Sequence, residues 1–260
     1  MPRFRVDDAA IDYRIAGQTG PLVVQLHGLT SSRARDAEMG LDLVRALRGH
    51  RVLKYDARGH GSSTGTREQA SYRWDRLAVD LLALLDHVAP GESVHAIGPS
   101  MGTGTLLHAA ARDPDRFASF TFALPPTAWG TREAQAEGYR ASADLIEEHG
   151  IEAFIEQGGT APVPPALADA PITYPEVSEA LLPTIMRAAA ASDFPDPAAV
   201  AAIRIPTLIL AWTGDPSHPL RTATRLHELI GGSRLVVART PYGVMAWPGL
   251  FAEHVITAAT

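Results

Sequence analysis

Residues 93–104 read SVHAIGPSMGTG and contain the most informative local pattern of the chain. An apolar run typical of a buried strand leads up to Gly98, and a helical pattern begins after Gly102. Ser100 stands between them in a Gly-x-Ser-x-Gly pattern, in which side chains two residues to either side of the serine would collide across a sharp turn. Because the two glycines remove those side chains, we expect a strand, a tight turn with Ser100 in a strained backbone conformation, and a helix.

The segments on both sides of this turn alternate between strand and helix patterns. Short apolar runs predict strands at 21–26, 51–55, 93–97, 117–124, 206–211 and 234–238. Helical periodicity occurs at about 33–48, 71–88, 102–112, 219–230 and 248–258. Short strands separated by helices form a parallel sheet that is covered on both faces. Residues 3–6 and 10–15 alternate like edge strands and predict an antiparallel hairpin.

The alternation stops between residues 125 and 205. This stretch is rich in Ala, Pro and Glu, and its helical patches lie near 131–148, 150–157 and 176–191. Strand patterns return only after it. We therefore expect one α/β core domain formed by residues 1–124 and 206–260, with residues 125–205 inserted as a helical cap.

The composition narrows the classes of function. A chain of 260 residues with 46% apolar residues can bury a large core without a disulfide or a metal. Because cysteine is absent, disulfides, thiolate catalysis and cysteine-based zinc sites are excluded. The net charge of −6 argues against a nucleic-acid or anionic-membrane partner. The first residues lack the apolar region of a signal peptide, and no apolar run reaches the roughly 18–20 residues of a membrane span, so we expect a cytoplasmic location.

Together with three further motifs, this pattern resembles the α/β-hydrolase superfamily, specifically its capped esterase and lactonase-like members. The motifs are LHGL at 26–29, DARGHGSS at 56–63 and GDP at 214–216. The resemblance covers nearly the whole chain and implies an α/β-hydrolase fold, a mostly parallel twisted sheet flanked by helices with a helical cap insertion. It also implies hydrolysis of a small to medium apolar carboxylic ester or lactone, without metal or organic cofactor, by a monomer or homodimer.

The resemblance assigns roles to individual residues. Ser100 would be the nucleophile, and the backbone N–H groups of Leu29 and Met101 would form the oxyanion hole. Asp215 resembles the acid of a catalytic triad, although it could instead only cap the helix that follows it. The 56–63 stretch resembles a structural signature of the family, whose Arg58 and His60 are expected to tie loops together.

The expected histidine is missing. In the family it follows the last strand, whereas residues 238–247 read ARTPYGVMAW in this chain. His218, three residues beyond Asp215, is a candidate for a relocated general base, and it could equally cap or pack the following helix. We expect His254 to be a surface or packing residue, His95 to be a packed core residue and His27 to organise its loop.

The missing histidine leaves a second class of function open. The chain could be a hydrolase-fold binding protein, or a non-hydrolytic biosynthetic enzyme that uses the pocket without a complete triad. Within the cap, four large side chains are candidates for lining the substrate pocket, although at helical spacing they could equally be plain core: Trp129, Tyr139, Phe154 and Met186.

Overall fold

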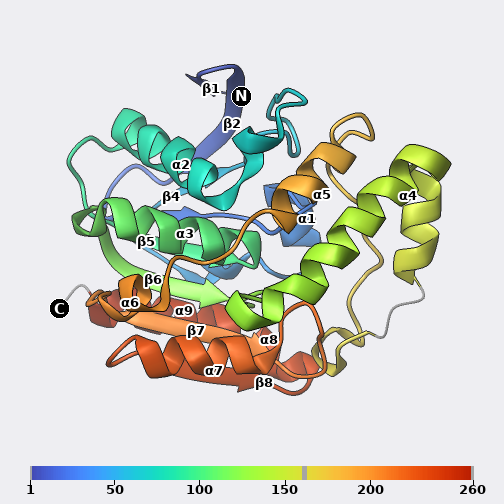
Figure 1. Cartoon of the computed structure of the whole chain (residues 1–260). Helices are drawn as coiled ribbons and strands as arrows, with labels where there is room; N and C mark the ends of the chain where they lie inside the picture. Colours follow the sequence, from blue (N-terminus) through green and yellow to red (C-terminus); the bar gives the residue numbers. More distant parts are fainter. Residues whose placement is uncertain (1, 160–162, 259–260) are drawn as a thin grey trace.

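The computed structural model describes residues 2–159 and 163–258, and these form an eight-stranded sheet between two layers of helices (Figure 1). The strands lie in the order β1-β2-β4-β3-β5-β6-β7-β8. Their bounds are β1 Arg3–Val6, β2 Ala9–Ala16, β3 Leu22–Gln25, β4 Arg51–Tyr55, β5 Val94–Pro99, β6 Phe117–Ala123, β7 Thr207–Trp212 and β8 Arg234–Ala238. β1 pairs with β2 and β2 with β4 in antiparallel fashion, and every later pair is parallel. The predicted fold class is confirmed.

Helices connect the strands and cover both faces of the sheet. The α-helices are α1 Arg33–Glu38, α2 Trp74–Val88, α3 Met101–Arg112, α4 Arg132–Gly159, α5 Leu182–Ala190, α6 Pro197–Ala201, α7 Leu220–Leu229, α8 Pro241–Met245 and α9 Trp247–Ala258. Short 3₁₀ helices are η1 Leu43–Ala46, η2 Gln69–Tyr72, η3 Pro114–Arg116, η4 Trp129–Thr131 and η5 Pro165–Leu167. Within the described residues, no helix is both long and apolar enough to cross a membrane.

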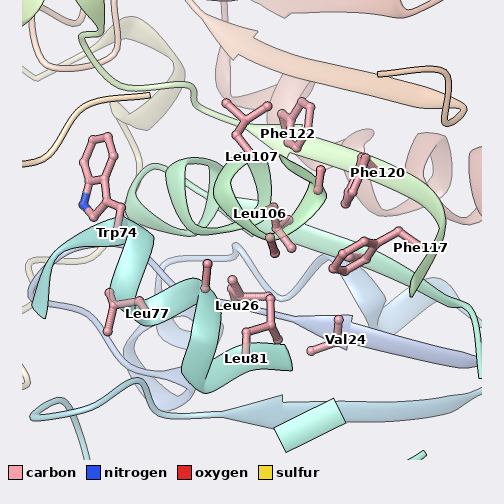
Figure 2. Close-up of a cluster of buried hydrophobic side chains, with 14 of the residues drawn as sticks. Val24, Leu26, Trp74, Leu77, Leu81, Leu106, Leu107, Phe117, Phe120 and Phe122 are labelled. Carbon is pink, nitrogen blue, oxygen red and sulfur yellow. The ribbon is translucent and has the colours of Figure 1, made fainter. Parts of the chain in front are cut away.

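The alternation of strand side chains creates two cores. In β3, Leu22 and Val24 point into one cluster, whereas Val23 points into the other. The first cluster contains side chains of α2, α3 and α7, and Figure 2 shows Trp74, Leu81 and Phe120 within it. The second contains side chains of η1 and α9. A sheet buried on both faces explains why its central strands are continuous apolar runs.

Two predicted helices differ from the structure. The pattern over 33–48 forms α1 and η1 as separate short helices, because Gly40 adopts a φ of 76° that a continuing helix does not allow. The pattern over 176–191 forms a helix only from Leu182, because Pro183 lies in the first turn, where its missing N–H costs no hydrogen bond.

The stretch between β6 and β7, for which we predicted a cap, contains α4, α5 and α6. Gly150 interrupts α4 with a φ of 84° and a ψ of 173°. α4 packs against α5, and the two lie side by side at the right of Figure 1. A small cluster that includes Ile146, Leu182 and Ile185 joins them. The division into core and cap stays a prediction.

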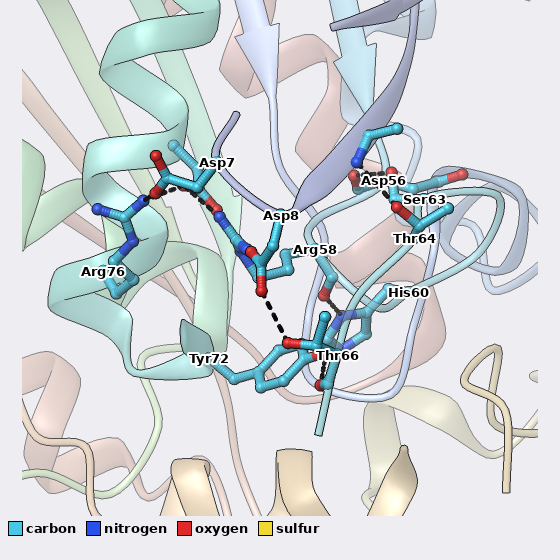
Figure 3. Close-up of polar contacts among 12 residues, drawn as sticks. Asp7, Asp8, Asp56, Arg58, His60, Ser63, Thr64, Thr66, Tyr72 and Arg76 are labelled. Carbon is cyan, nitrogen blue, oxygen red and sulfur yellow. Dashed lines mark hydrogen bonds and ion pairs between the residues drawn. The ribbon is translucent and has the colours of Figure 1, made fainter. Parts of the chain in front are cut away.

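The 56–63 stretch holds a buried ion-pair network (Figure 3). The Arg58 side chain, only 1% exposed, donates to both carboxylate oxygens of Asp80 on α2 at 2.9 and 3.0 Å and also pairs with Asp8. His60 Nδ1 donates to the Arg58 carbonyl at 2.9 Å. Arg58 therefore ties the β1–β2 turn to α2, as the structural interpretation of this motif predicted.

Candidate active site

Ser100 occupies the turn between β5 and α3 in a conformation that L-residues rarely adopt. Its φ is 50° and its ψ is −112°, which confirms the predicted strain. A Cβ on Gly98 would lie 2.5 Å from the backbone carbon of Gly102, so the turn requires glycine there. Thr103 fastens the turn, because its Oγ1 donates to the Gly98 carbonyl at 2.7 Å and its N–H to the Ser100 carbonyl at 2.8 Å.

His218 contacts the serine. It lies in the loop between β7 and α7, and its Nε2 is 2.9 Å from Ser100 Oγ, although the two residues are 118 positions apart. Its Nδ1 is 2.7 Å from Asp215 Oδ2. Because a carboxylate only accepts, Nδ1 carries the ring proton and donates to Asp215, which leaves Nε2 as the acceptor for the serine hydroxyl. The structure thus brings Ser100, His218 and Asp215 into one hydrogen-bonded chain.

Asp215 is held by its own loop. Its Oδ1 accepts the backbone N–H groups of Ser217 at 2.9 Å and His218 at 3.2 Å, and its Oδ2 accepts Trp212 Nε1–H at 2.8 Å. Burial raises the pKa of Asp215, but the hydrogen bond and charge of His218, with the bonds from Trp212 and Ser217, outweigh it and bring the pKa down to about 2. Asp215 is therefore ionised at neutral pH.

Neither Asp215 nor His218 caps α7, which was the alternative interpretation of these residues. The residue that caps α7 is Pro219, and no side chain bonds to the first N–H groups of that helix within the described part of the chain. The His218 side chain instead contacts Ser100 Oγ, and the Asp215 carboxylate contacts the His218 ring. The loop thus closes on itself through Asp215 and presents the imidazole to the serine.

The other histidines have structural partners. His254 Nε2 donates to the Phe120 carbonyl at 3.0 Å, and His95 Nδ1 is 2.8 Å from Ser119 Oγ, so both pack as predicted. His27 Nδ1 donates to the Gly28 carbonyl at 2.8 Å, and its Nε2 accepts the Ala57 N–H at 2.8 Å. Burial lowers the pKa of His27 to about 4, so its ring is neutral and organises the loop, as expected.

The loop that His27 organises lies against the serine. A Cβ built on Gly28 would be 3.6 Å from the Ser100 Cβ, and Met101 is the first residue of α3. Within residues 2–159 and 163–258, the N–H groups of Leu29 and Met101 have no protein acceptor. Unpaired N–H groups beside a helix N-terminus favour a developing negative charge.

A cavity of about 230 Å³ opens at this site. Its polar lining includes Arg35 and Asp36 besides Ser100 and His218. Its apolar lining consists of Leu29, Met39, Leu41, Pro99, Leu124, Pro164, Leu167 and Trp212. Sequence analysis missed the two charged residues. They follow the 26–29 motif closely, and this proximity is the signal that could have found them.

The predicted cap lining is wrong for this cavity. Tyr139, Phe154 and Met186 pack in the small cluster around Ile185, and Trp129 packs against Phe194. None of the four lines the cavity at Ser100. Their helical spacing reflects packing between helices and strands, which was the alternative interpretation. Among the described residues, no group of three or more His, Asp or Glu side chains could hold a metal ion.

Comparison with known proteins identifies the family of this chain. A family model described as alpha/beta hydrolase fold matches residues 21–143. A 3-oxoadipate enol-lactonase from Acinetobacter baylyi is 31% identical over 195 residues, which cover 72% of this chain and 69% of that protein. The chain belongs to the α/β-hydrolase family.

Solved structures agree on the fold of this α/β-hydrolase. An enol-lactonase from Burkholderia xenovorans has a TM-score of 0.77 at 23% identity, and the match covers 99% of both chains. A thermophilic esterase from Thermogutta terrifontis has a TM-score of 0.76 at 19% identity, with 100% of both chains covered. At these identities the likeness concerns the fold alone.

Proposed function

We propose that this α/β-hydrolase cleaves a carboxylic ester or a lactone through an acyl-enzyme on Ser100. The observation that carries the proposal is the continuous chain from Ser100 Oγ through the His218 ring to Asp215 Oδ2, with contacts of 2.9 and 2.7 Å. The name of the Acinetobacter relative, an enol-lactonase, supports the same substrate class.

In the first half-reaction, His218 Nε2 takes the hydroxyl proton while Ser100 Oγ forms a bond to the carbonyl carbon. The tetrahedral intermediate then breaks its bond to the leaving oxygen, and His218 returns the proton to that oxygen. In the second half-reaction, a water molecule gives a proton to His218 and attacks the acyl carbon, and Ser100 leaves with that proton. Asp215 stays ionised throughout and stabilises the imidazolium.

The negative oxygen of each intermediate would accept the N–H groups of Leu29 and Met101. Each such donor is worth roughly 3–4 kcal/mol where it has been removed from other enzymes. The strained Ser100 backbone forms the turn between β5 and α3, and at this turn Ser100 Oγ contacts His218 Nε2. The proposed chemistry needs no metal and no organic cofactor.

The cavity limits the substrate. A volume of about 230 Å³ and a mostly apolar lining favour a small substrate with an aliphatic part. We propose that the partner is a small-molecule substrate. The cytoplasmic location and the monomeric or homodimeric state stay predictions from the sequence. The net charge of −6 supports the absence of nucleic acid among the partners.

Turnover of short-chain esters and lactones by the wild type, Ser100→Ala and Ser62→Ala tests the proposal. Ser62 is an exposed serine that does not line the cavity, and it serves as the matched control. We expect Ser100→Ala to lose about 10⁶-fold in kcat, and Ser62→Ala to retain wild-type turnover. Quenched-flow mass spectrometry should show an acyl adduct on Ser100. Equal turnover by Ser100→Ala would reject the proposal and favour a binding or non-hydrolytic role.

A further inference from the structure

Arg35 brings a positive charge to the active-site cavity. It lies on α1, and its side chain lines the same cavity as Ser100 and His218. Its Nε donates to Thr173 Oγ1 at 2.9 Å, and its Nη1 donates to the carbonyl and the Oγ1 of Thr30 at 3.0 and 3.1 Å. These three bonds fix the guanidinium and leave Nη2 without a protein acceptor in the described part of the chain.

Arg35 forms no ion pair within the described part of the chain. Within residues 2–159 and 163–258, no carboxylate oxygen lies within 4.0 Å of the Arg35 guanidinium. Arg58 differs in this respect, since it pairs with Asp80 and Asp8. Burial lowers the pKa of Arg35, and the more distant charges of Asp36, Glu176 and Glu38 offset this only in part. A half-buried guanidinium that stays protonated is stabilised when a bound anion supplies the missing charge.

The neighbouring Asp36 does not supply that charge near neutral pH. Its Oδ1 accepts the Ser31 hydroxyl at 2.6 Å, while its buried Oδ2 has no partner. Burial raises the pKa of Asp36 to about 7, so a large share of the carboxyl is protonated at neutral pH. In that form it repels no anion.

Arg35 also has a positioning role that requires no charge. Thr30 adopts a φ of 58°, and its carbonyl accepts both Arg35 Nη1–H and the Glu176 N–H, the latter at 2.8 Å. These bonds hold the turn that follows Leu29. They use Nε and Nη1, however, and leave both Nη2 protons and the charge unexplained.

We propose that Arg35 is a specificity-determining residue that binds a carboxylate carried by the substrate, so that this hydrolase prefers acidic esters or lactones. This inference rests on the proposed function and refines it. The apolar lining holds an aliphatic chain, Ser100 attacks the carbonyl group, and Arg35 Nη2 binds the carboxylate in the same cavity. The guanidinium is already fixed by its other hydrogen bonds, so binding costs little side-chain entropy.

Paired substrates separate this role from a structural one. Monomethyl glutarate and monomethyl adipate are compared with methyl pentanoate and methyl hexanoate, and 4-acetoxybutanoate with butyl acetate, by following alcohol or acid release. The measured quantity is the ratio of kcat/KM for the acidic ester to kcat/KM for its neutral partner. We expect the wild type to favour the acidic member of at least one pair. A wild type that prefers every neutral partner overturns the inference.

Variants of Arg35 test the cause of the preference. Arg35→Gln should lower that ratio by about 10- to 100-fold, the effect of losing a hydrogen bond between charged groups, and Arg35→Lys should restore part of it. The control is Arg45→Gln, which removes an exposed guanidinium that bonds to the Gly40 and Asp42 carbonyls outside this cavity. It should leave the ratio unchanged. If Arg35→Gln slows both members of a pair equally, Arg35 only positions the loop and the inference is wrong.

A binding measurement keeps this inference separate from the proposed function. Glutarate and adipate are titrated calorimetrically into Ser100→Ala and into Ser100→Ala/Arg35→Gln. Binding that the second variant weakens supports the carboxylate site even if the wild type turns over no ester. Equal affinities, together with wild-type turnover of neutral esters that Arg35→Gln leaves intact, would overturn the inference while the proposed function stands.

Discussion

The loops after β7 and β8 leave the sheet at the same edge, yet they differ in chemistry. The two strands are parallel, and Trp212 lies opposite Ala238 at their ends. The β7 loop carries Asp215 and His218, whereas the segment after β8 contains no histidine or carboxylate, and its Tyr242 is 81% exposed. The family resemblance predicts an acid after one strand and a base after the other. Here a single loop holds both.

The conformation of the loop after β7 explains how Asp215 and His218 come together within a few residues. Gly214, with a φ of 77°, reverses the chain after β7, and Asp215 Oδ1 then accepts the N–H groups of Ser217 and His218. The turn places the imidazole three residues later against Asp215 Oδ2 and toward Ser100. A short closed loop therefore achieves the arrangement that otherwise needs residues from two loops.

Removing the base should produce the largest effect. His218→Ala is expected to lower kcat by about 10⁶-fold, because the serine proton then has no acceptor, while the fold is retained. Tyr242→Ala, in the segment after β8, should leave kcat unchanged. Steady-state ester hydrolysis by both variants measures the contrast between the loops. Comparable losses in the two variants would mean that both loops contribute.

Neutralising the acid should cost less. Asp215→Asn keeps the shape of the side chain but can donate to His218 Nδ1, which favours the wrong ring tautomer, and we expect about a 10⁴-fold loss in kcat. Asp169→Asn, an exposed residue outside the cavity at Ser100, is the matched control. Unchanged turnover by Asp215→Asn would show that the position of His218 does not depend on the Asp215 carboxylate.

Asp36 is a second carboxyl at the site, and its pKa is shifted in the opposite direction to that of Asp215. Because the pKa of Asp36 rises from 3.8 to about 7 on folding, the folded state binds more protons than the unfolded state between these values. The free energy of unfolding should therefore fall as the pH rises from 4 to 7. Asp36→Asn removes this term, so its stability relative to the wild type should rise by up to about 4 kcal/mol over the interval. Denaturant unfolding at each pH measures it, and a difference independent of pH would contradict the account.

The smallest expected effect concerns the indole that supports Asp215. Trp212→Phe removes the Nε1–H donor at 2.8 Å from Asp215 Oδ2 and keeps most of the apolar packing. We expect about a 10-fold loss in kcat, the value of one hydrogen bond to a charged acceptor. Trp247→Phe is a matched control, because its buried Nε1 has no partner among the described residues. Equal effects of the two substitutions would assign the loss to packing.

Local sterics made much of the fold predictable. The Gly98–Gly102 turn follows from crowding between residues four positions apart, and the central strands follow from burial on both faces of the sheet. The break at Gly40 was missed, because the apolar periodicity continues across it while the backbone does not. The charged residues that line the cavity were missed for a different reason, although they lie close to the 26–29 motif. Arg35 is fixed by Thr173, 138 positions away, and no local pattern predicts such a contact.

The site itself was only partly predictable. The motif around Ser100 identified the turn, and proximity to Asp215 suggested His218. The sequence could not choose between a base and a packing residue, because that choice depends on how Gly214 turns the loop. In the structure the ring lies 2.9 Å from Ser100 Oγ, and this contact supports the proposed role as the base.

The proposed function requires that His218, from the same loop as Asp215, activates Ser100. The rate at which a fluorophosphonate probe modifies Ser100, followed by peptide mass spectrometry, tests it most directly, because the reaction requires an activated serine and no particular substrate. We predict rapid stoichiometric modification of the wild type and of Tyr242→Ala, and none of folded His218→Ala over the same time. Modification of His218→Ala at the wild-type rate would contradict the claim.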